Sequence, residues 1–220
     1  HRLTAARLDR SEPTAIVDTA IARGSVEGGR ELVADMAENN EDTLLFWDGA
    51  WGPRRDVVVA VNGSFFDLDT GVPHGGQMID GWYIKRHDEM GGNSGFSWWM
   101  NTATGRHEIF IGGCVHYRDE KNLVTWADGA TQTIEDVDAA RPAGALIIYT
   151  PYFAPDTGTD GSGVEVLVEL TRPLLLIPTP SGVQGTVAAV YESAGSTPIP
   201  FDHVVLSATA CLLYTSPSPR

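Results

Sequence analysis

The chain has 220 residues, of which 29 are acidic and 15 basic, which gives a formal net charge of −14. This charge repels nucleic-acid backbones and anionic membrane surfaces, so we expect neither as a partner. The hydrophobic content of 42% is sufficient for a packed core. No apolar run approaches the roughly 18 residues of a membrane helix, so we expect no membrane span.

The N-terminal part of the chain predicts two strands followed by one helix. Residues 2–23 show alternating apolar positions, a pattern typical of strands. Gly28 and Gly29 precede a predicted short helix that ends at Asn39. Its apolar stripe is expected to pack against a sheet and consists of Leu32, Val33, Met36 and Ala37. Residues 43–55 predict an irregular insertion loop, whose aromatic side chains fit either a sugar-stacking surface or packing at the domain edge.

The stretch from Asp56 to Arg86 combines a predicted strand, a glycine-rich loop and a hairpin. Val57–Val61 is an apolar, mostly β-branched run bounded by charge and by Asn-Gly, which predicts a buried strand. Residues 77–86 predict a hairpin with Asp80-Gly81 at its turn. Polar groups, aromatic rings and glycines therefore gather where a buried strand reaches the surface, a common position for a binding or catalytic site.

The rest of the chain predicts mainly strands. Residues 96–112 predict a hairpin with Gly105 at the tight position of its turn. Further strands are predicted at 124–126, 146–150, 164–170, 187–191 and 203–207, and a loop or brief helix at 136–141. Pro173 and Pro178 interrupt an apolar run that fits an edge strand or an irregular segment. The predicted fold class is α+β, with a mostly antiparallel, twisted or barrel-like sheet and few short helices.

The C-terminal end has an unusual sequence. Residues 211–220, CLLYTSPSPR, resemble the translation of a sequencing adaptor joined to a truncated metagenomic read. We therefore expect a non-native tail after residue 210, and an ordinary tail rich in Pro and Ser is the alternative. On the first interpretation, Cys114 is the single native cysteine. Cys114 and Cys211 are the only two cysteines and do not define a disulfide framework.

A longer pattern carries a resemblance to a known family. The residues from Asn62 to Gly81 fit NGxFFDxxxGxPxGGxxxDG, which resembles the entry motif of the phosphodiester glycosidase family. Segments that agree in the family's order are the helix at 28–37, the hairpin at 96–112, the strands at 146–151 and 163–166, and the strand at 199–206. The resemblance implies hydrolysis of a sugar-1-phosphodiester, which releases the sugar from the phosphate, in a secreted or cell-envelope protein.

The implied chemistry selects candidate site residues. Glycoside cleavage uses a group that assists the leaving oxygen and a carboxylate that stabilises or attacks the oxocarbenium ion. A phosphate leaving group has a low pKa, which lessens the need for a strong general acid. The candidate catalytic residues are Asn62, Asp67, His74 and Glu165, and the candidate substrate-binding residues are Gly75, Gly76 and Arg106.

Each candidate also has a structural interpretation. Asn62 either locks its loop or binds a sugar hydroxyl, and its predicted place at a strand end favours a buried side chain over use of its glycosylation sequon. His74 is either a phosphate donor or an exposed loop histidine. Glu165 points either into a cleft or outward by strand alternation. Arg106 either holds a phosphate bidentately or is a solvated turn arginine.

Other kinds of site have no support in the sequence. No His, Cys or Asp cluster has metal-ligand spacing, and no P-loop, dinucleotide fingerprint or GxSxG pattern occurs, so we expect no metal and no cofactor. The family's Asp-Gly-Gly-Gly-Ser segment is also absent. The resemblance therefore implies that residues 1–210 are the N-terminal part of a domain that is incomplete at its C-terminus and inactive alone. A non-catalytic carbohydrate-binding or cell-envelope module is the alternative.

Overall fold

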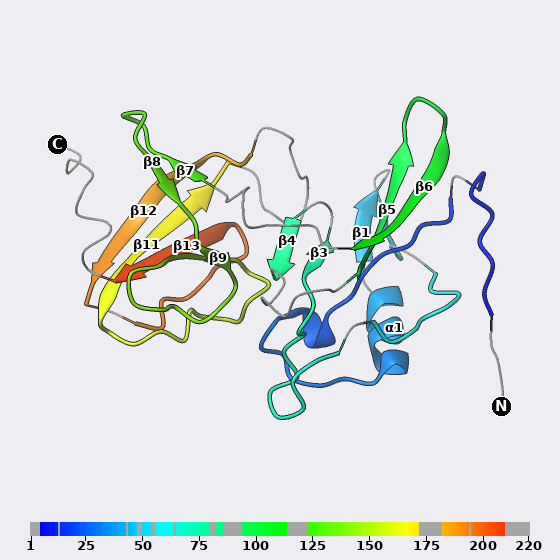
Figure 1. The fold of residues 1–220 in the computed structure, drawn as a ribbon, viewed down its shortest axis with the longest axis horizontal. Coiled ribbons are helices and arrows are strands. Elements are labelled where there is room, and N and C mark those ends of the chain that lie inside the picture. The colour runs from blue at the N-terminus through cyan, green and yellow to red at the C-terminus, as the bar shows by residue number, and fades with distance from the viewer. Residues whose placement is uncertain are drawn as a thin grey trace. The chain divides into compact units, whose positions relative to one another are not determined.

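The structure is a computed structural model, drawn in Figure 1. It describes residues 5–12, 14–42, 44–47, 50–53, 56–63, 65–79, 82–85, 94–113, 123–171, 182–193 and 195–209. The chain divides into two compact units. Unit 1 contains residues 1–20, 32–63 and 89–116, and unit 2 contains residues 21–31, 64–88 and 117–220. Each unit is described by itself.

Unit 2 is built on a five-stranded sheet with the order β12-β11-β13-β10-β9. Its strands are β9 (Asp136–Val137), β10 (Leu146–Tyr149), β11 (Gly163–Leu170), β12 (Gly185–Glu192) and β13 (His203–Thr209). Neighbouring strands are antiparallel except for β9 and β10, which are parallel. The strands predicted at 146–150, 164–170, 187–191 and 203–207 are confirmed. Of the loop or brief helix predicted at 136–141, residues 138–141 form a loop, whereas residues 136–137 form β9.

Both faces of this sheet carry a hydrophobic core, because apolar residues occupy successive positions along the central strands. One cluster includes Ile147, Tyr149 and Val205, together with Ile84 from a neighbouring hairpin. The other cluster lies on alternate residues of the same strands and includes Leu146, Val166 and Leu206. Alternate residues of a strand face opposite sides, so continuous apolar runs indicate a strand that is buried on both faces.

Unit 2 also contains two hairpins and a 3-10 turn. Strands β3 (Gln77–Ile79) and β4 (Trp82–Lys85) form the predicted antiparallel hairpin. The predicted turn at Asp80-Gly81 lies outside the described residues. Strands β7 (Leu123–Thr125) and β8 (Thr131–Thr133) form the second hairpin, which confirms a strand near 124–126, and η1 (Ala22–Gly24) is a 3-10 helix.

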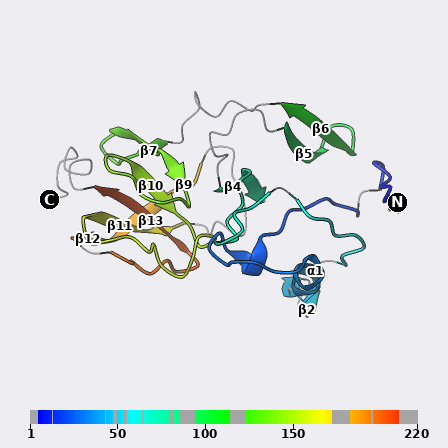
Figure 2. The same cartoon turned by 60° about the horizontal axis from the view of Figure 1, so that its bottom comes forward.

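Unit 1 contains the helix α1 (Val33–Glu41) and two hairpins. Strands β1 (Leu44–Trp47) and β2 (Ala50–Pro53) form one hairpin where the sequence predicted an irregular loop. Strands β5 (Ser94–Asn101) and β6 (Arg106–Gly113) form the other, as predicted. Its turn places Gly105 at φ +65°, a conformation that glycine adopts at little cost. Figure 2 gives a second view of these elements.

Three predictions for unit 1 are wrong. Residues 56–63 form no strand, and Val58 is 90% exposed, so Val57–Val61 is not a buried strand. A strand needs a hydrogen-bonding neighbour, and here the Val57 N–H donates to the Glu41 carboxylate instead (2.9 Å). Helix α1 contains no buried residue, so the burial predicted for its apolar stripe is wrong: Leu32 is exposed, and Val33, Met36 and Ala37 are only half-buried. The described part of residues 2–23 also forms no strand.

Taken together, the described residues are mostly β, with antiparallel or mixed open sheets and one α-helix. The mostly antiparallel character predicted from the sequence is confirmed for these residues. Several sequence predictions fall outside the described part of the chain: Cys114, the proline-interrupted run at 173–178, and the tail at 211–220.

The burial pattern leads to a stability prediction. Ile147→Ala should lower the free energy of unfolding by about 2–5 kcal/mol, because it opens a cavity in a packed core. Val58→Ala should change it by no more than about 0.5 kcal/mol, because that side chain is already solvated. Urea denaturation of both variants measures the difference. Comparable losses would show that the valine run is buried after all.

Candidate functional site

The glycine-rich part of the motif forms a closed loop in unit 2. The Asp67 N–H donates to the Val72 carbonyl (2.8 Å), and the His74 N–H donates to the Phe65 carbonyl (2.9 Å). Phe66 and Pro73 form an isolated bridge between these bonds. The paired ends hold residues 67–72 as a loop and fix the backbone on which Asp67 and His74 are carried.

Asp67 caps this loop with its carboxylate. Its Oδ1 accepts hydrogen bonds from the N–H of Thr70 (2.7 Å), the Thr70 hydroxyl (2.9 Å) and the N–H of Asp69 (2.9 Å). The two Thr70 bonds, and then the Asp69 bond, hold the pKa of the Asp67 carboxyl below its ordinary value, and the charge of His74 acts in the same direction. Asp67 is therefore ionised at neutral pH, which suits a charge-stabilising role rather than a general acid.

The loop leads directly into the β3–β4 hairpin. Gly75 is buried, while His74 and Gly76 are half-buried. The next residue, Gln77, pairs with Lys85 at the end of β4. Lys85 is itself buried, which is uncommon for a lysine. The hairpin register thus places a buried lysine opposite Gln77, the residue that follows the segment carrying His74, Gly75 and Gly76.

Sequence reasoning missed Lys85. The residue lies inside the hairpin predicted at 77–86, and the prediction assigned it no role. A signal was present, because a hairpin that turns at Asp80-Gly81 places Lys85 close to Gln77. Only the burial of this lysine in the folded chain gives it weight as a site residue.

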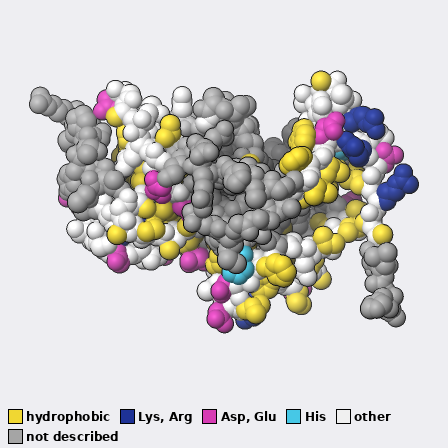
Figure 3. All heavy atoms as spheres, in the orientation of Figure 1, with side chains coloured by type: hydrophobic (Ala, Val, Ile, Leu, Met, Phe, Trp, Pro, Cys, Tyr) yellow, Lys and Arg dark blue, Asp and Glu magenta, His cyan; other side chains and the backbone are white. Residues whose placement is uncertain are grey.

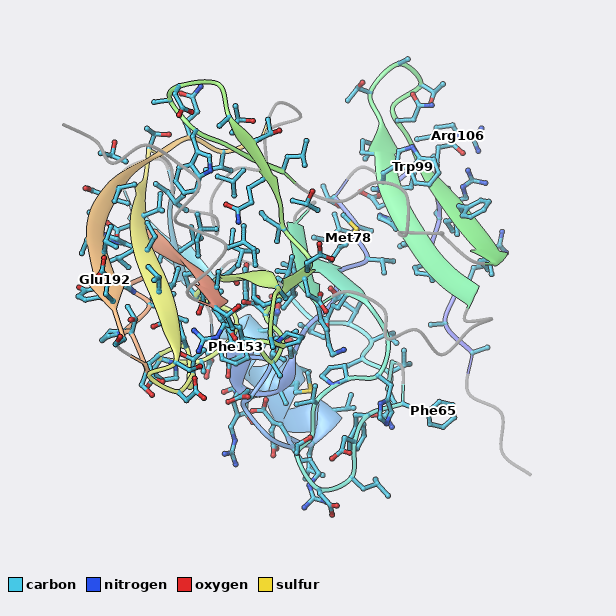
Figure 4. All side chains as sticks on the ribbon, turned by 60° about the vertical axis from the view of Figure 1, so that its left-hand side comes forward. Phe65, Met78, Trp99, Arg106, Phe153 and Glu192 are labelled. Carbon is cyan, nitrogen blue, oxygen red and sulfur yellow. The ribbon has the colours of Figure 1, made fainter. Side chains whose placement is uncertain are left out.

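Two aromatic residues precede Asp67 in the same loop. Phe65 is 88% exposed and Phe66 is also exposed. Figure 4 shows Phe65 extending away from the ribbon. An exposed ring beside a carboxylate and a histidine presents an apolar surface next to charged groups, an arrangement that suits a sugar.

Glu165 lies in the core and does not face solvent. It lies on β11 directly opposite Ser207 of β13, and its side chain has no exposed surface. Its Oε1 accepts from the Thr159 hydroxyl (2.7 Å) and the Ser207 hydroxyl (2.8 Å). Its Oε2 accepts from the Thr157 hydroxyl and the Thr197 N–H, both at 3.2 Å. The carboxylate is therefore held by donors from several parts of the chain.

The charge state of Glu165 follows from two opposing effects. Burial by itself raises the pKa of the carboxyl, and the four hydrogen bonds together outweigh it, so the pKa lies below its ordinary value. Arg141 extends the network, because its Nη1 donates to the Ser207 hydroxyl (2.8 Å) and its Nη2 to Asp160 Oδ1 (2.7 Å). The sequence singled out Glu165 but offered no signal for Arg141 or Ser207 as its neighbours.

Asp138 is a second buried carboxyl in unit 2, and its pKa is shifted in the opposite direction from that of Glu165. Its Oδ1 accepts from the Thr150 N–H (2.7 Å), and its Oδ2 accepts from the Thr150 hydroxyl (2.6 Å). Burial raises the pKa of Asp138 well above its ordinary value, and these two hydrogen bonds oppose that effect only in part. The backbone of Asp138 has φ +50°, a conformation that Asn also tolerates.

The other two candidates belong to unit 1. Asn62 is exposed and lies in the irregular segment 56–63, so the buried strand-end position predicted for it is wrong. Arg106 is exposed at the first position of β6. The structure thus groups Asp67, His74, Gly75 and Gly76 in one segment of unit 2, and Glu165 occupies the core of that unit.

The described residues contain no metal-binding cluster and no helix that could span a membrane. No group of three or more His, Cys, Asp or Glu side chains in that part of the chain could hold a metal ion. None of the described helices is both long and apolar enough to cross a membrane. Comparison with known proteins found no matching family model, curated protein or solved structure.

The buried carboxyls of Glu165 and Asp138 should affect the pH dependence of stability in opposite directions. The lowered pKa of Glu165 means that its ionised form stabilises the fold above pH 4.5, the ordinary value, and that this stabilisation is lost as the pH falls through the folded-state pKa. Glu165→Gln should therefore destabilise the protein at pH 7, by about 1–3 kcal/mol. The difference from wild type should shrink below pH 4.5.

Asp138→Asn is the matched control. The raised pKa of Asp138 means that its contribution to stability falls as the pH rises above 3.8, the ordinary value, towards the folded-state pKa. The neutral Asn should therefore be at least as stable as wild type at pH 7, and its advantage should decrease on acidification. Chemical denaturation at a series of pH values measures both. A loss at pH 7 in Asp138→Asn as large as that in Glu165→Gln would contradict the assignment.

Proposed function

We propose that this chain belongs to a hydrolase of the phosphodiester glycosidase type, whose full-length form cleaves a sugar-1-phosphodiester and releases the sugar from the phosphate. The observation that carries the proposal is the buried Lys85, which the hairpin register places opposite Gln77 at the end of the segment that carries His74, Gly75 and Gly76. This segment belongs to the motif that resembles the family's entry motif. A cation, an imidazole and glycine N–H groups together form a suitable environment for a phosphate.

The reaction breaks the bond between the anomeric carbon and a phosphodiester oxygen. Water supplies the hydroxyl to the anomeric carbon, and its proton passes to solvent or to the departing phosphate. In this proposal, Lys85 and His74 stabilise the negative charge of the phosphate as it leaves. Asp67, whose lowered pKa keeps it ionised, stabilises the positive charge that develops on the sugar.

Glu165 has a different role in the proposal. It is completely buried and its two oxygens are occupied by four protein donors, so it does not contact substrate. We assign it to the positioning of the loops around the sheet. The proposed location is outside the cell or in the cell envelope, where glycan and sugar-phosphate substrates are available.

A second candidate function is a non-catalytic carbohydrate-binding or cell-envelope module. The exposed rings of Phe65 and Phe66 favour it, because aromatic rings pack against the apolar face of a sugar without any chemistry. On this alternative, Asp67 would serve only to fix the loop through its bonds to Thr70 and Asp69. Both functions predict that the protein binds a sugar, and only the hydrolase predicts turnover of a sugar-1-phosphodiester.

A turnover assay of the full-length enzyme on a nucleotide-linked sugar-1-phosphodiester tests the proposal. Lys85→Met and His74→Ala should each lower turnover by about a hundredfold or more, because each removes a group that stabilises developing charge. Asp67→Asn should do the same. Asp69→Asn, which changes a neighbouring exposed carboxylate in the same loop, is the matched control and should retain turnover within about twofold.

The outcomes separate the two candidates. The binding module would be favoured if the protein binds a sugar without turnover. In that case, Phe65→Ala should lose the binding and Lys85→Met should retain it. Equal turnover in wild type and in the three site variants would remove this segment from the active site. Thermal midpoints of all variants, measured in parallel, distinguish a loss of chemistry from a loss of folding.

A further inference from the structure

The β5–β6 hairpin of unit 1 carries aromatic and basic residues on one of its faces. Trp99 pairs with Glu108, Phe110 with Ser97, and Arg106 with Asn101. Directly paired residues lie on the same side of a sheet, and so do alternate residues along a strand. Trp99, Arg106, Glu108 and Phe110 therefore share one side, called here the aromatic face.

The strand register places Trp99 between Arg106 and Phe110 on the aromatic face. Phe110 and Arg106 are each displaced by two residues from Glu108, the direct partner of Trp99, so both are diagonal neighbours of the Trp99 ring. Such neighbours are about 7–8 Å apart, within reach of long side chains. Trp99 is 47% exposed and Phe110 is 52% exposed. Figure 4 shows Trp99 and Arg106 close together on the facing strands.

Among the described residues, the cations Arg10 and Arg106 differ in how directly they are paired with a carboxylate. Arg10 Nη2 lies 2.8 Å from Glu108 Oε2, so the carboxylate of the aromatic face is already paired. The Asp9 carboxylate accepts from the Ser11 N–H and hydroxyl. Arg106 forms no salt bridge with any described residue. The two Ser11 hydrogen bonds lower the pKa of the Asp9 carboxyl, and the charge of Arg106 has a smaller effect in the same direction. In Figure 3, the visible Lys and Arg side chains gather mainly near this hairpin, beside exposed hydrophobic side chains.

We propose that the aromatic face binds a sugar that carries one anionic group, a phosphate or a carboxylate. The rings of Trp99 and Phe110 would pack against the apolar faces of sugar units, and the guanidinium of Arg106 would bind the anion bidentately. The net charge of −14 opposes a ligand with a charge on every unit, such as a nucleic acid. This site belongs to unit 1 and is independent of the hydrolysis proposed for unit 2.

The experiment measures binding of the full chain to maltohexaose and to the same oligosaccharide phosphorylated at O6, by calorimetry. The phosphorylated form is not a 1-phosphodiester, so hydrolysis at the other site does not affect the result. We expect the phosphorylated form to bind more tightly. Trp99→Ala and Phe110→Ala should each weaken its binding by about tenfold or more. Arg106→Gln should abolish the preference for the phosphorylated form and leave binding of maltohexaose unchanged.

Phe96→Ala is the matched control. Phe96 is the same residue type as Phe110, lies on the same hairpin and is similarly exposed, at 55%, but it pairs with Ile111 on the opposite face. Its replacement should leave binding unchanged. A glucuronic-acid oligosaccharide, inorganic phosphate and a single-stranded oligonucleotide complete the set of ligands. Retained preference for glucuronate over a neutral sugar would identify the anion as a carboxylate.

Several outcomes would overturn the proposal. The first is that neither anionic oligosaccharide binds. The second is that Phe96→Ala and Phe110→Ala bind the phosphorylated oligosaccharide equally well. The third is that the oligonucleotide binds more tightly than the anionic oligosaccharides. Trp99→Tyr keeps an aromatic ring and should retain most of the binding, which separates a lost contact from a disturbed hairpin if Trp99→Ala proves unstable. Loss of binding in Trp99→Tyr, with its thermal midpoint unchanged, would also contradict stacking as the mode of recognition.

Discussion

The burial of the Glu165 carboxylate is the constraint on which the arrangement of unit 2 depends. Moving an ionised carboxylate out of water is strongly unfavourable unless hydrogen bonds replace its hydration. Here the donors are Thr157, Thr159, Thr197 and Ser207, which come from two loops and from β13. The charge can remain buried only while β11, β13 and both loops keep their positions, so one side chain couples parts of the chain that are distant in sequence.

The same face of the sheet also supports the segment proposed to bind phosphate. Ile147, Tyr149 and Val205 lie on it, and Ile84 of β4 packs into their cluster, with Val72 and Ile79 at its edge. The position of the loop at 67–76 therefore depends on hydrophobic packing against the sheet, while its internal shape depends on the hydrogen bonds of Asp67. In this segment, hydrophobic packing therefore fixes the position of the loop, and polar contacts fix its internal shape.

In unit 1, more of the described hydrophobic side chains are exposed than in unit 2. Its hairpin β5–β6 exposes aromatic and aliphatic residues on both faces, and helix α1 contains no buried residue. His107 is the exception, since its ring is buried and stacks against Trp98 with centroids 4.6 Å apart. Arg10 holds that end of the hairpin: the His107 N–H donates to the Arg10 carbonyl (3.1 Å), and Arg10 Nε donates to the His107 carbonyl (2.7 Å). A surface with so many exposed rings is better suited to binding than to forming a core.

The sequence by itself determined the local elements, because their signals are local. The hairpins at β3–β4 and β5–β6, the strands β10, β11 and β13, and the approximate place of α1 follow from periodicity and turn residues. Burial was decided only by the tertiary structure, because it depends on which surfaces meet. Val57–Val61 has the composition of a buried strand, yet without a partner strand it is exposed. Strand alternation could not tell whether Glu165 faces solvent or core, and the same limit applies to Lys85, whose burial depends on residues far away in the chain.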